Sequence, residues 1–171
     1  MKEIEIKIIE IDKKEIISKL KKLGAKKIFE GIVSGMTFKS GNPNWDTDKQ
    51  MLRLRQEGDN FFLCLKSKLN IKSKAKVRDE IEVEINDLNN MKLILEKLGF
   101  SKQNQNTKYR TSYKLKNSRI EIEECKPFTP FLEIEAPNLK EIKKIVELLG
   151  FTMKDTKNWT LKDLFEYYNK K

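Results

Sequence analysis

The sequence has no histidine, only two cysteines and no long apolar run. Without histidine, serine–histidine–aspartate catalysis, cysteine–histidine catalysis and histidine-ligated zinc are excluded. Cys64 and Cys125 are too few for a structural zinc site, so a catalytic metal would need carboxylate ligands, which favour Mg²⁺, Mn²⁺ or Ca²⁺. No segment approaches the roughly 20 apolar residues that cross a bilayer, and Met1 leads directly into a strand-like pattern without a signal peptide. We therefore expect a cytoplasmic chain with reduced thiols and no membrane partner.

Charge, by contrast, is abundant in this chain of 171 residues, which has 36 Lys and Arg against 26 Asp and Glu and a net charge of +10. The length is that of one ordinary domain, and we expect a single domain over residues 1–171. The positive excess favours anionic partners such as nucleotides, polyphosphates or nucleic acid, without choosing among them.

An internal repeat organises the chain, because three segments combine a strand of alternating acidic and aliphatic residues with a short amphipathic helix that ends at Leu-Gly. Each predicted helix has an N-cap candidate twelve residues before a glycine that is suited to a left-handed C-terminal cap. The cap pairs are Asp12 and Gly24, Asp87 and Gly99, and Asn138 and Gly150. The apolar stripes of the three helices are Ile16, Ile17, Leu20 and Leu23; Met91, Ile94, Leu95 and Leu98; and Ile142, Ile145, Val146 and Leu149.

Further strand-like stretches separate the repeats, and together they predict an α+β fold of about eight strands and three or four helices. The additional strands are expected at 31–39, 51–56, 60–66, 108–114 and 119–124. Segments 41–49 and 68–76 have the composition of loops, and the second is rich in lysine. A last helix is expected over about 160–168, with Thr160 as its N-cap.

Charged residues occupy one face of six predicted strands, while the other face of the same strands is aliphatic. The charged face carries Glu3, Glu5 and Lys7; Arg53 and Arg55; Arg78, Glu80, Glu82 and Glu84; Lys108 and Arg110; Arg119, Glu121 and Glu123; and Glu133 and Glu135. For one strand alone, an ordinary sheet with a face in water is the simplest explanation. Six strands with paired acids favour a barrel with a charged interior, where carboxylates bind metal and Arg or Lys bind phosphate oxygens.

These motifs resemble those of a known family. Glu3-x-Glu5-x-Lys7 resembles the ExExK signature of the CYTH superfamily, the triphosphate tunnel metalloenzymes, which include class IV adenylyl cyclases, thiamine triphosphatases and inorganic triphosphatases. Further matches follow in the family's order over residues 1 to about 150. They are Leu52-Arg53-Leu54-Arg55, Lys66, Arg78-x-Glu80-x-Glu82, Lys108-x-Arg110-x-x-Tyr113, Glu123 and Phe131-Leu132-Glu133-Ile134-Glu135.

The resemblance implies a closed eight-stranded antiparallel β-barrel with helices packed outside, Mg²⁺ or Mn²⁺ as cofactor, and a small-molecule triphosphate as substrate. It implies metal ligands among Glu3, Glu5, Glu80, Glu82, Glu123, Glu133 and Glu135. It implies phosphate contacts from Lys7, Arg53, Arg55, Lys66, Arg78, Lys108 and Arg110. We take Lys7, Glu5 and Glu135 as the catalytic candidates.

The leading hypothesis is metal-dependent hydrolysis of a triphosphate, in which a carboxylate, or Lys7 if its pKa is depressed, orients or deprotonates the attacking water. The alternative within the same fold is cyclisation of ATP to cyclic AMP and pyrophosphate. A non-catalytic module that binds polyphosphate or nucleic acid is the alternative of another class, although paired acids beside the arginines argue against a nucleic-acid groove. Trp45 and Trp159 are more simply structural than base-stacking residues, and the oligomeric state, monomer or homodimer, stays open.

Overall fold

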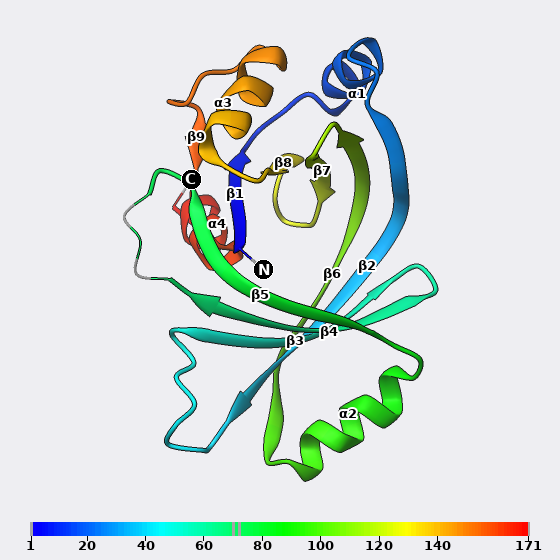
Figure 1. Cartoon of the computed structure of the whole chain (residues 1–171), viewed down its shortest axis with the longest axis vertical. Helices are drawn as coiled ribbons and strands as arrows, with labels where there is room; N and C mark the ends of the chain where they lie inside the picture. Colours follow the sequence, from blue (N-terminus) through cyan, green and yellow to red (C-terminus); the bar gives the residue numbers. More distant parts are fainter. Residues whose placement is uncertain (1, 70, 72, 171) are drawn as a thin grey trace. The chain divides into compact units, whose positions relative to one another are not determined.

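The computed structural model describes residues 2–69, 71 and 73–170, and its strands and helices can be followed in Figure 1. In chain order the elements are β1 (Lys2–Ile8), α1 (Lys13–Lys22), β2 (Lys26–Ser40), β3 (Gln50–Glu57), β4 (Asn60–Lys68), β5 (Lys76–Ile85), α2 (Leu88–Lys97), β6 (Phe100–Leu115), β7 (Ser118–Glu124), β8 (Phe131–Glu135), α3 (Leu139–Leu148), β9 (Thr156–Lys157) and α4 (Leu161–Tyr168). Among these described residues, no helix is long and apolar enough to cross a membrane.

The strands form one sheet in the order β5-β4-β3-β2-β6-β7-β8-β1-β9, and β5 also pairs with β1. This additional pairing closes β1 to β8 into a ring of neighbouring strands, while the two-residue β9 pairs with the end of β1. The fold is therefore a closed eight-stranded antiparallel β-barrel with helices outside, which confirms the predicted fold class.

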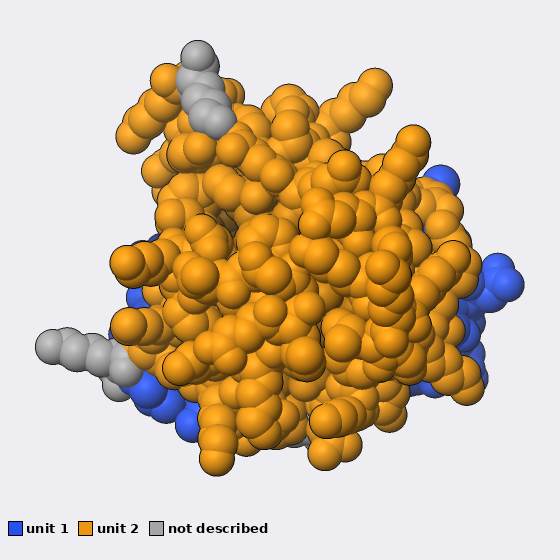
Figure 2. Space-filling view, turned by 90° about the horizontal axis from the view of Figure 1, so that it is seen from above, with its two compact units in different colours: residues 1–2, 31–71, 78–107 blue, residues 3–30, 72–77, 108–171 orange. Residues whose placement is uncertain are grey.

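The chain divides into two compact units, which Figure 2 colours separately. Unit 1 contains Lys2 and the described residues of 31–71 and 78–107. Unit 2 contains the described residues of 3–30, 73–77 and 108–170. The expectation of a single domain stays a prediction.

The helix boundaries follow the repeat. The side chains of Asp12, Asp87 and Asn138 accept hydrogen bonds from backbone N–H groups at the start of α1, α2 and α3. The glycines twelve residues later all have a positive φ, between 74° and 85°, which is the left-handed conformation that favours glycine. The predicted caps are thus confirmed, and Thr160 caps α4 in a reciprocal capping box with Asp163.

In unit 2, the first strand is buried on both faces. Ile6 and Ile8 are buried on the aliphatic face of β1, and Glu5 and Lys7 are buried on the charged face with 8% and 3% of their surface exposed. An ordinary wet face would leave the charged side chains in solvent. That simpler explanation is therefore wrong for β1. Helix α3 contacts β8, and all four residues of its predicted stripe are buried, as expected.

In unit 1, the predicted stripe of α2 is only half right. Leu95 is buried against Phe38, Leu52 and Leu54, and Met91 packs beside it, whereas Ile94 and Leu98 are 50% and 68% exposed. The physical reason is that only one side of the apolar stripe, the side with Met91 and Leu95, packs against the sheet at β3. The outer aliphatic residues Ile81 and Val83 of β5 are likewise exposed.

Two strands extend beyond their predicted bounds. β2 begins at Lys26 and β6 at Phe100, earlier than the predicted 31 and 108. The first half of β6, Ser101–Thr107, is polar at every position and exposed on both faces. Such a segment has no alternation of apolar and polar residues, so periodicity could not identify it. Segment 41–49 lies between strands as predicted. The second loop is shorter than the predicted 68–76, because Lys68 ends β4 and Lys76 begins β5, and its positions 70 and 72 lie outside the described residues.

Candidate functional site

The strand register places charged side chains of unit 2 side by side. In the antiparallel pair β1–β8, Glu5 stands opposite Glu135 and Lys7 opposite Glu133. In β7–β8, Glu121 stands opposite Glu133, and in β6–β7, Arg110 stands opposite Glu123. Directly opposed residues point to the same face with Cβ atoms about 5 Å apart. Four strands therefore present their charged residues to one another.

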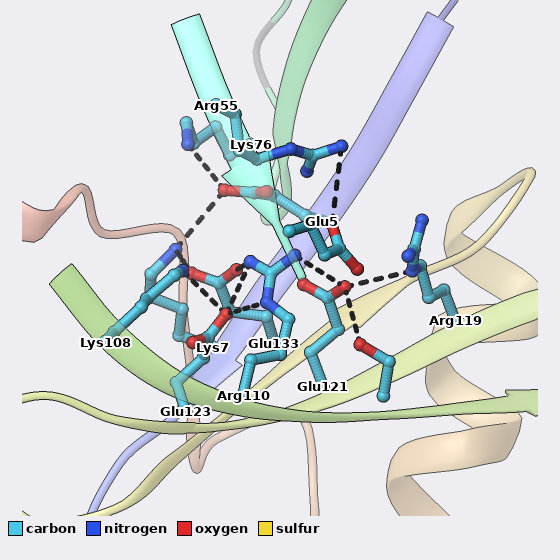
Figure 3. A network of polar contacts seen from close by, with 12 residues as sticks. Glu5, Lys7, Arg55, Lys76, Lys108, Arg110, Arg119, Glu121, Glu123 and Glu133 are labelled. Atoms are coloured by element: carbon cyan, nitrogen blue, oxygen red, sulfur yellow. Dashed lines mark hydrogen bonds and ion pairs between the residues drawn. The ribbon is translucent and has the colours of Figure 1, made fainter. Parts of the chain in front are cut away.

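These residues form a buried network of alternating charge, shown in Figure 3. The Lys7 Nζ atom lies 2.8 Å from Glu133 Oε1 and 3.3 Å from Glu5 Oε1. The Arg110 guanidinium lies 2.9 Å from Glu121 and 2.6 Å from Glu123. We call this set the acid–base network. It comprises Glu5, Lys7, Lys76, Lys108, Arg110, Arg119, Glu121, Glu123 and Glu133.

Lys7 is held in its charged form. Burial alone would lower the pKa of Lys7, but the adjacent Glu133 and Glu5 carboxylates outweigh burial and raise that pKa. The condition under which Lys7 was expected to act as a base, a depressed pKa, is therefore not met. In this arrangement Lys7 is a fixed cation.

The pKa values of two neighbouring carboxyl groups in the network are shifted in opposite directions. Burial raises the pKa of Glu123 despite the nearby Lys108 and Arg110 cations. Burial acts in the same direction on Glu133, but Lys7, Lys108 and Arg110 prevail and hold its pKa well below the usual range. Glu133 is thus an anion, while Glu123 is fully buried and holds a proton more readily than an ordinary glutamic acid.

The donor set of this cluster fits a hard divalent cation. Glu121, Glu123 and Glu133 each offer one oxygen, and the three oxygens lie within 4.8 Å of one another. The Glu123 Oε2 atom is buried and has no hydrogen-bond partner among the described residues. Because a buried carboxylate oxygen is costly to leave without a partner, an additional ligand would stabilise this atom. Carboxylate oxygens are the ligands that Mg²⁺ and Mn²⁺ prefer.

Unit 1 contains a second, smaller set of ion pairs. Arg55 donates a hydrogen bond of 3.0 Å to Glu82, and Lys66 lies 3.2 Å from Glu80. The Cys64 thiol donates to Glu80 at 2.8 Å, and Cys64, Glu80 and Glu82 also place one ligand atom each within 4.8 Å. Burial and the hydrogen bond to Glu80 raise the pKa of Cys64 to about 12. The thiol is therefore protonated, which makes it a poor metal ligand.

The structure brings most of the predicted site residues into these two sets. Unit 2 unites Glu5, Lys7, Lys108, Arg110, Glu123 and Glu133, and unit 1 unites Arg55, Lys66, Glu80 and Glu82. Glu3 is buried, Arg53 and Arg78 are half-buried, and Glu135 is exposed at the end of β8. Trp45 packs edge-on against Phe100, and Trp159 contacts Tyr167.

Three residues of the site region were absent from the predicted set. Glu121 and Arg119 were assigned to the charged face but not to the site, although Glu121 shares its i, i+2 spacing with Glu123. Lys76 lies two residues before Arg78 and so shares a strand face with Arg78 and Glu80. Because Lys76 was assigned to a lysine-rich loop on the sequence alone, this shared face was missed.

Comparisons with known proteins agree with this geometry. The family model described as "CYTH domain" matches residues 1–154. A protein of Methanocaldococcus jannaschii named "Putative adenylate cyclase" is 34% identical over 149 residues, which are 86% of this chain and 85% of that protein. The structure of the PH1012 protein from Pyrococcus horikoshii has a TM-score of 0.74 at 26% identity, with coverage of 92% of this chain and 96% of the other. A Hippeastrum structure has a TM-score of 0.62 at 18% identity, covers 85% of this chain and 84% of its own, and is described as a "Putative adenylyl cyclase" with "a dominant triphophatase activity".

Proposed function

The chain belongs to the CYTH domain family, and we propose that within this family it is a metal-dependent triphosphatase. Members of the family are enzymes, adenylyl cyclases or triphosphatases, and they depend on a metal. The proposed substrate is inorganic tripolyphosphate, thiamine triphosphate or a nucleoside triphosphate, with Mg²⁺ or Mn²⁺ as cofactor. The proposed location is the cytoplasm.

The observation that carries the proposal is the acid–base network, in which buried carboxylates alternate with buried cations. For example, the single carboxylate of Glu133 lies 2.8 Å from Lys7 and 3.8 Å from Arg110. A groove with cations only would attract a phosphate chain but hold no metal, and a groove with acids only would hold metal but repel the chain. A metal–triphosphate complex needs both kinds of group next to each other.

In this proposal Glu121, Glu123 and Glu133 would hold the metal, with Glu3, Glu5 and Glu135 of unit 2 as further ligand candidates. A metal-binding role for Glu80 and Glu82 of unit 1 stays a prediction. When bound, the metal neutralises charge on the phosphate oxygens and so lowers the barrier to phosphoryl transfer. Lys7, Lys108 and Arg110 would donate to non-bridging oxygens, which fixes the position of the phosphate chain. The assignment of Arg53, Arg55, Lys66 and Arg78 of unit 1 to the same substrate stays a prediction.

The attacking water needs a carboxylate that solvent can reach. Glu135 is exposed and stands opposite the buried Glu5 in the register of β1 and β8. We assign the acceptance of the water's proton to Glu135, and the orientation of the water to both residues.

Cyclisation of ATP is the second candidate, because the Methanocaldococcus jannaschii relative bears a cyclase name. The two reactions use the same metal and phosphate contacts and differ in the nucleophile, water or the ribose 3′-hydroxyl. Binding of nucleic acid is disfavoured, because the carboxylates that neutralise Lys7 and Arg110 would repel a phosphate backbone.

The test is product analysis after incubation with tripolyphosphate, thiamine triphosphate and ATP, each with Mg²⁺ or Mn²⁺. We expect orthophosphate from at least one substrate, and a loss on the order of 10²–10⁴-fold in turnover for Glu5→Gln and for Glu135→Gln. Glu141→Gln, an acid in the first turn of α3, is the matched control and should retain activity. Cyclic AMP and pyrophosphate as main products from ATP would support the alternative, and full turnover in both site variants would contradict the assignment.

A further inference from the structure

We propose that Lys76 holds the place of a divalent cation at Glu5: its ammonium pairs with the Glu5 carboxylate in the metal-free protein, leaves when the metal binds, and then contacts the phosphate chain. This inference rests on the proposed function and adds a residue that neither the motifs nor the family match identify. Lys76 would thus be a positioning residue that couples metal binding to substrate binding.

The position of Lys76 separates it from the other lysines of segment 68–76. Lys76 is the first residue of β5, and its Nζ atom lies 2.5 Å from Glu5 Oε1, with 20% of the side chain exposed. Lys68 and Lys74 are exposed. The following residue, Val77, is buried, so that alternation along β5 directs Lys76 to the charged face. Figure 3 shows Lys76 and Lys7 approaching the same Glu5 carboxylate.

The Glu5 carboxylate is shared unequally by two ammonium groups. Lys7 lies 3.3 Å from Glu5 Oε1 but also 2.8 Å from Glu133 Oε1, so it keeps a partner if Glu5 turns to another cation. Among the residues that the structure describes, Lys76 forms an ion pair with Glu5 only. Lys76 is therefore the cation whose pairing depends on Glu5 being free of metal.

Competition at Glu5 follows from elementary electrostatics. An ammonium group and a divalent metal ion bind the same carboxylate oxygens, and two cations on one buried carboxylate repel each other. A metal ion at Glu5 would therefore compete with the two ammonium groups, and it would displace Lys76, which has no second carboxylate partner among the described residues. The displaced ammonium remains beside the cluster, because Lys76 is tethered to β5, and a metal-bound triphosphate is the anion that would neutralise it there.

The experiment measures metal binding and substrate binding separately in the full chain. Mn²⁺ affinity is measured by calorimetry without substrate, and the KM for tripolyphosphate is measured at saturating Mn²⁺. For Lys76→Met we expect Mn²⁺ to bind about tenfold more tightly and the KM to rise about tenfold with little change in kcat. Lys74→Met removes an exposed lysine from the same segment and should change neither quantity. Lys76→Arg keeps the charge and should restore the KM.

Mn²⁺ affinity equal in Lys76→Met and Lys74→Met would overturn the inference, because a purely structural ion pair predicts that result.

If Lys76→Met does not fold, acetylation of lysines in the wild-type protein gives an independent answer by mass spectrometry. Lys76 should be protected without metal, become reactive with Mg²⁺, and be protected again with Mg²⁺ and tripolyphosphate. Unchanged reactivity on addition of Mg²⁺ would also overturn it. The metal measurements need no turnover, so a protein that binds Mn²⁺ as described but hydrolyses nothing would contradict the proposed function and leave the role of Lys76 standing.

Discussion

At the scale of single residues, the site is defined by charges that neutralise one another away from water. Glu133 contacts both Lys7 and Arg110, whose side chains are only 3% and 5% exposed. An isolated buried charge costs several kcal/mol. Without Glu133, Arg110 keeps Glu121 and Glu123, but Lys7 keeps, among the described residues, only the longer contact of 3.3 Å with Glu5. The Glu133 carboxylate therefore has both a structural role and a proposed chemical role. A comparison of its substitution with that of a surface carboxylate measures how much its burial contributes to stability.

We predict that Glu133→Gln lowers the free energy of unfolding by about 1–3 kcal/mol, because Lys7 loses its ion pair of 2.8 Å and keeps only Glu5 among the described carboxylates. Turnover of tripolyphosphate should fall with it. Glu124→Gln is the control, since Glu124 pairs with Lys13 where both side chains are about one-third exposed, and should cost less than about 1 kcal/mol. Chemical denaturation of both variants measures the difference. Equal stability losses would show that the burial of the Glu133 pair has no energetic consequence.

At the scale of elements, the helices were predictable and part of the sheet was not. Cap spacing located α1, α2 and α3 because a side-chain acceptor and a glycine act locally, within the segment that they bound. The exposed half of the α2 stripe was not predictable, since only tertiary contact decides which side of an apolar stripe is covered. Nor was the polar first half of β6, whose strand conformation depends on its neighbours in the sheet rather than on its own pattern.

The capping box of α4 gives a prediction about pH. Hydrogen bonds from the Thr160 hydroxyl and then from its backbone N–H hold the pKa of Asp163 below its usual range. A lowered pKa in the folded state means that the stabilisation is complete above the unfolded-state pKa of about 3.9 and disappears as the pH falls through the folded-state value. Asp163→Asn should therefore cost about 1 kcal/mol near pH 7 and progressively less below about pH 4.

Denaturation at several pH values measures this difference, with Glu166→Gln, an exposed acid in the same helix, as the control. A cost for Asp163→Asn that stays constant from pH 7 to pH 2.5 would mean that the ionised carboxylate is not what stabilises the start of α4.

At the scale of the whole molecule, the sequence reveals which residues share a face but not which of them meet. Alternation along the strands identified the charged face with Glu5, Lys7, Glu123 and Glu133, because the period of two is a local property. The partners of each charge follow from the register between strands, such as Lys7 opposite Glu133. Register depends on contacts between distant segments. For this reason the contacts of Glu121 and Lys76 within the acid–base network emerged only from the structure.

Metal binding should be visible as stability of the folded chain. A ligand that binds only the folded state adds about 2.7 kcal/mol at a concentration of 100 times its Kd. For a chain of this length that corresponds to roughly 5–10 °C in the thermal midpoint. We expect such a rise with Mn²⁺ or Mg²⁺ and its reversal with a chelator. Scanning calorimetry measures the midpoint, with NaCl of equal ionic strength as control. An identical midpoint with and without saturating divalent metal would rule out a folded-state site.

The pairing of β1 with β8 also has a consequence for synthesis of the protein on the ribosome. Glu5 and Lys7 are synthesised about 130 residues before their partners Glu135 and Glu133. A nascent or truncated chain that stops before Phe131 lacks Glu133, which lies 2.8 Å from Lys7 in the folded chain, so this part of the acid–base network forms last. Contacts this distant in sequence slow folding, and premature termination anywhere upstream of β8 should yield a chain that neither completes its ring of strands nor turns over substrate.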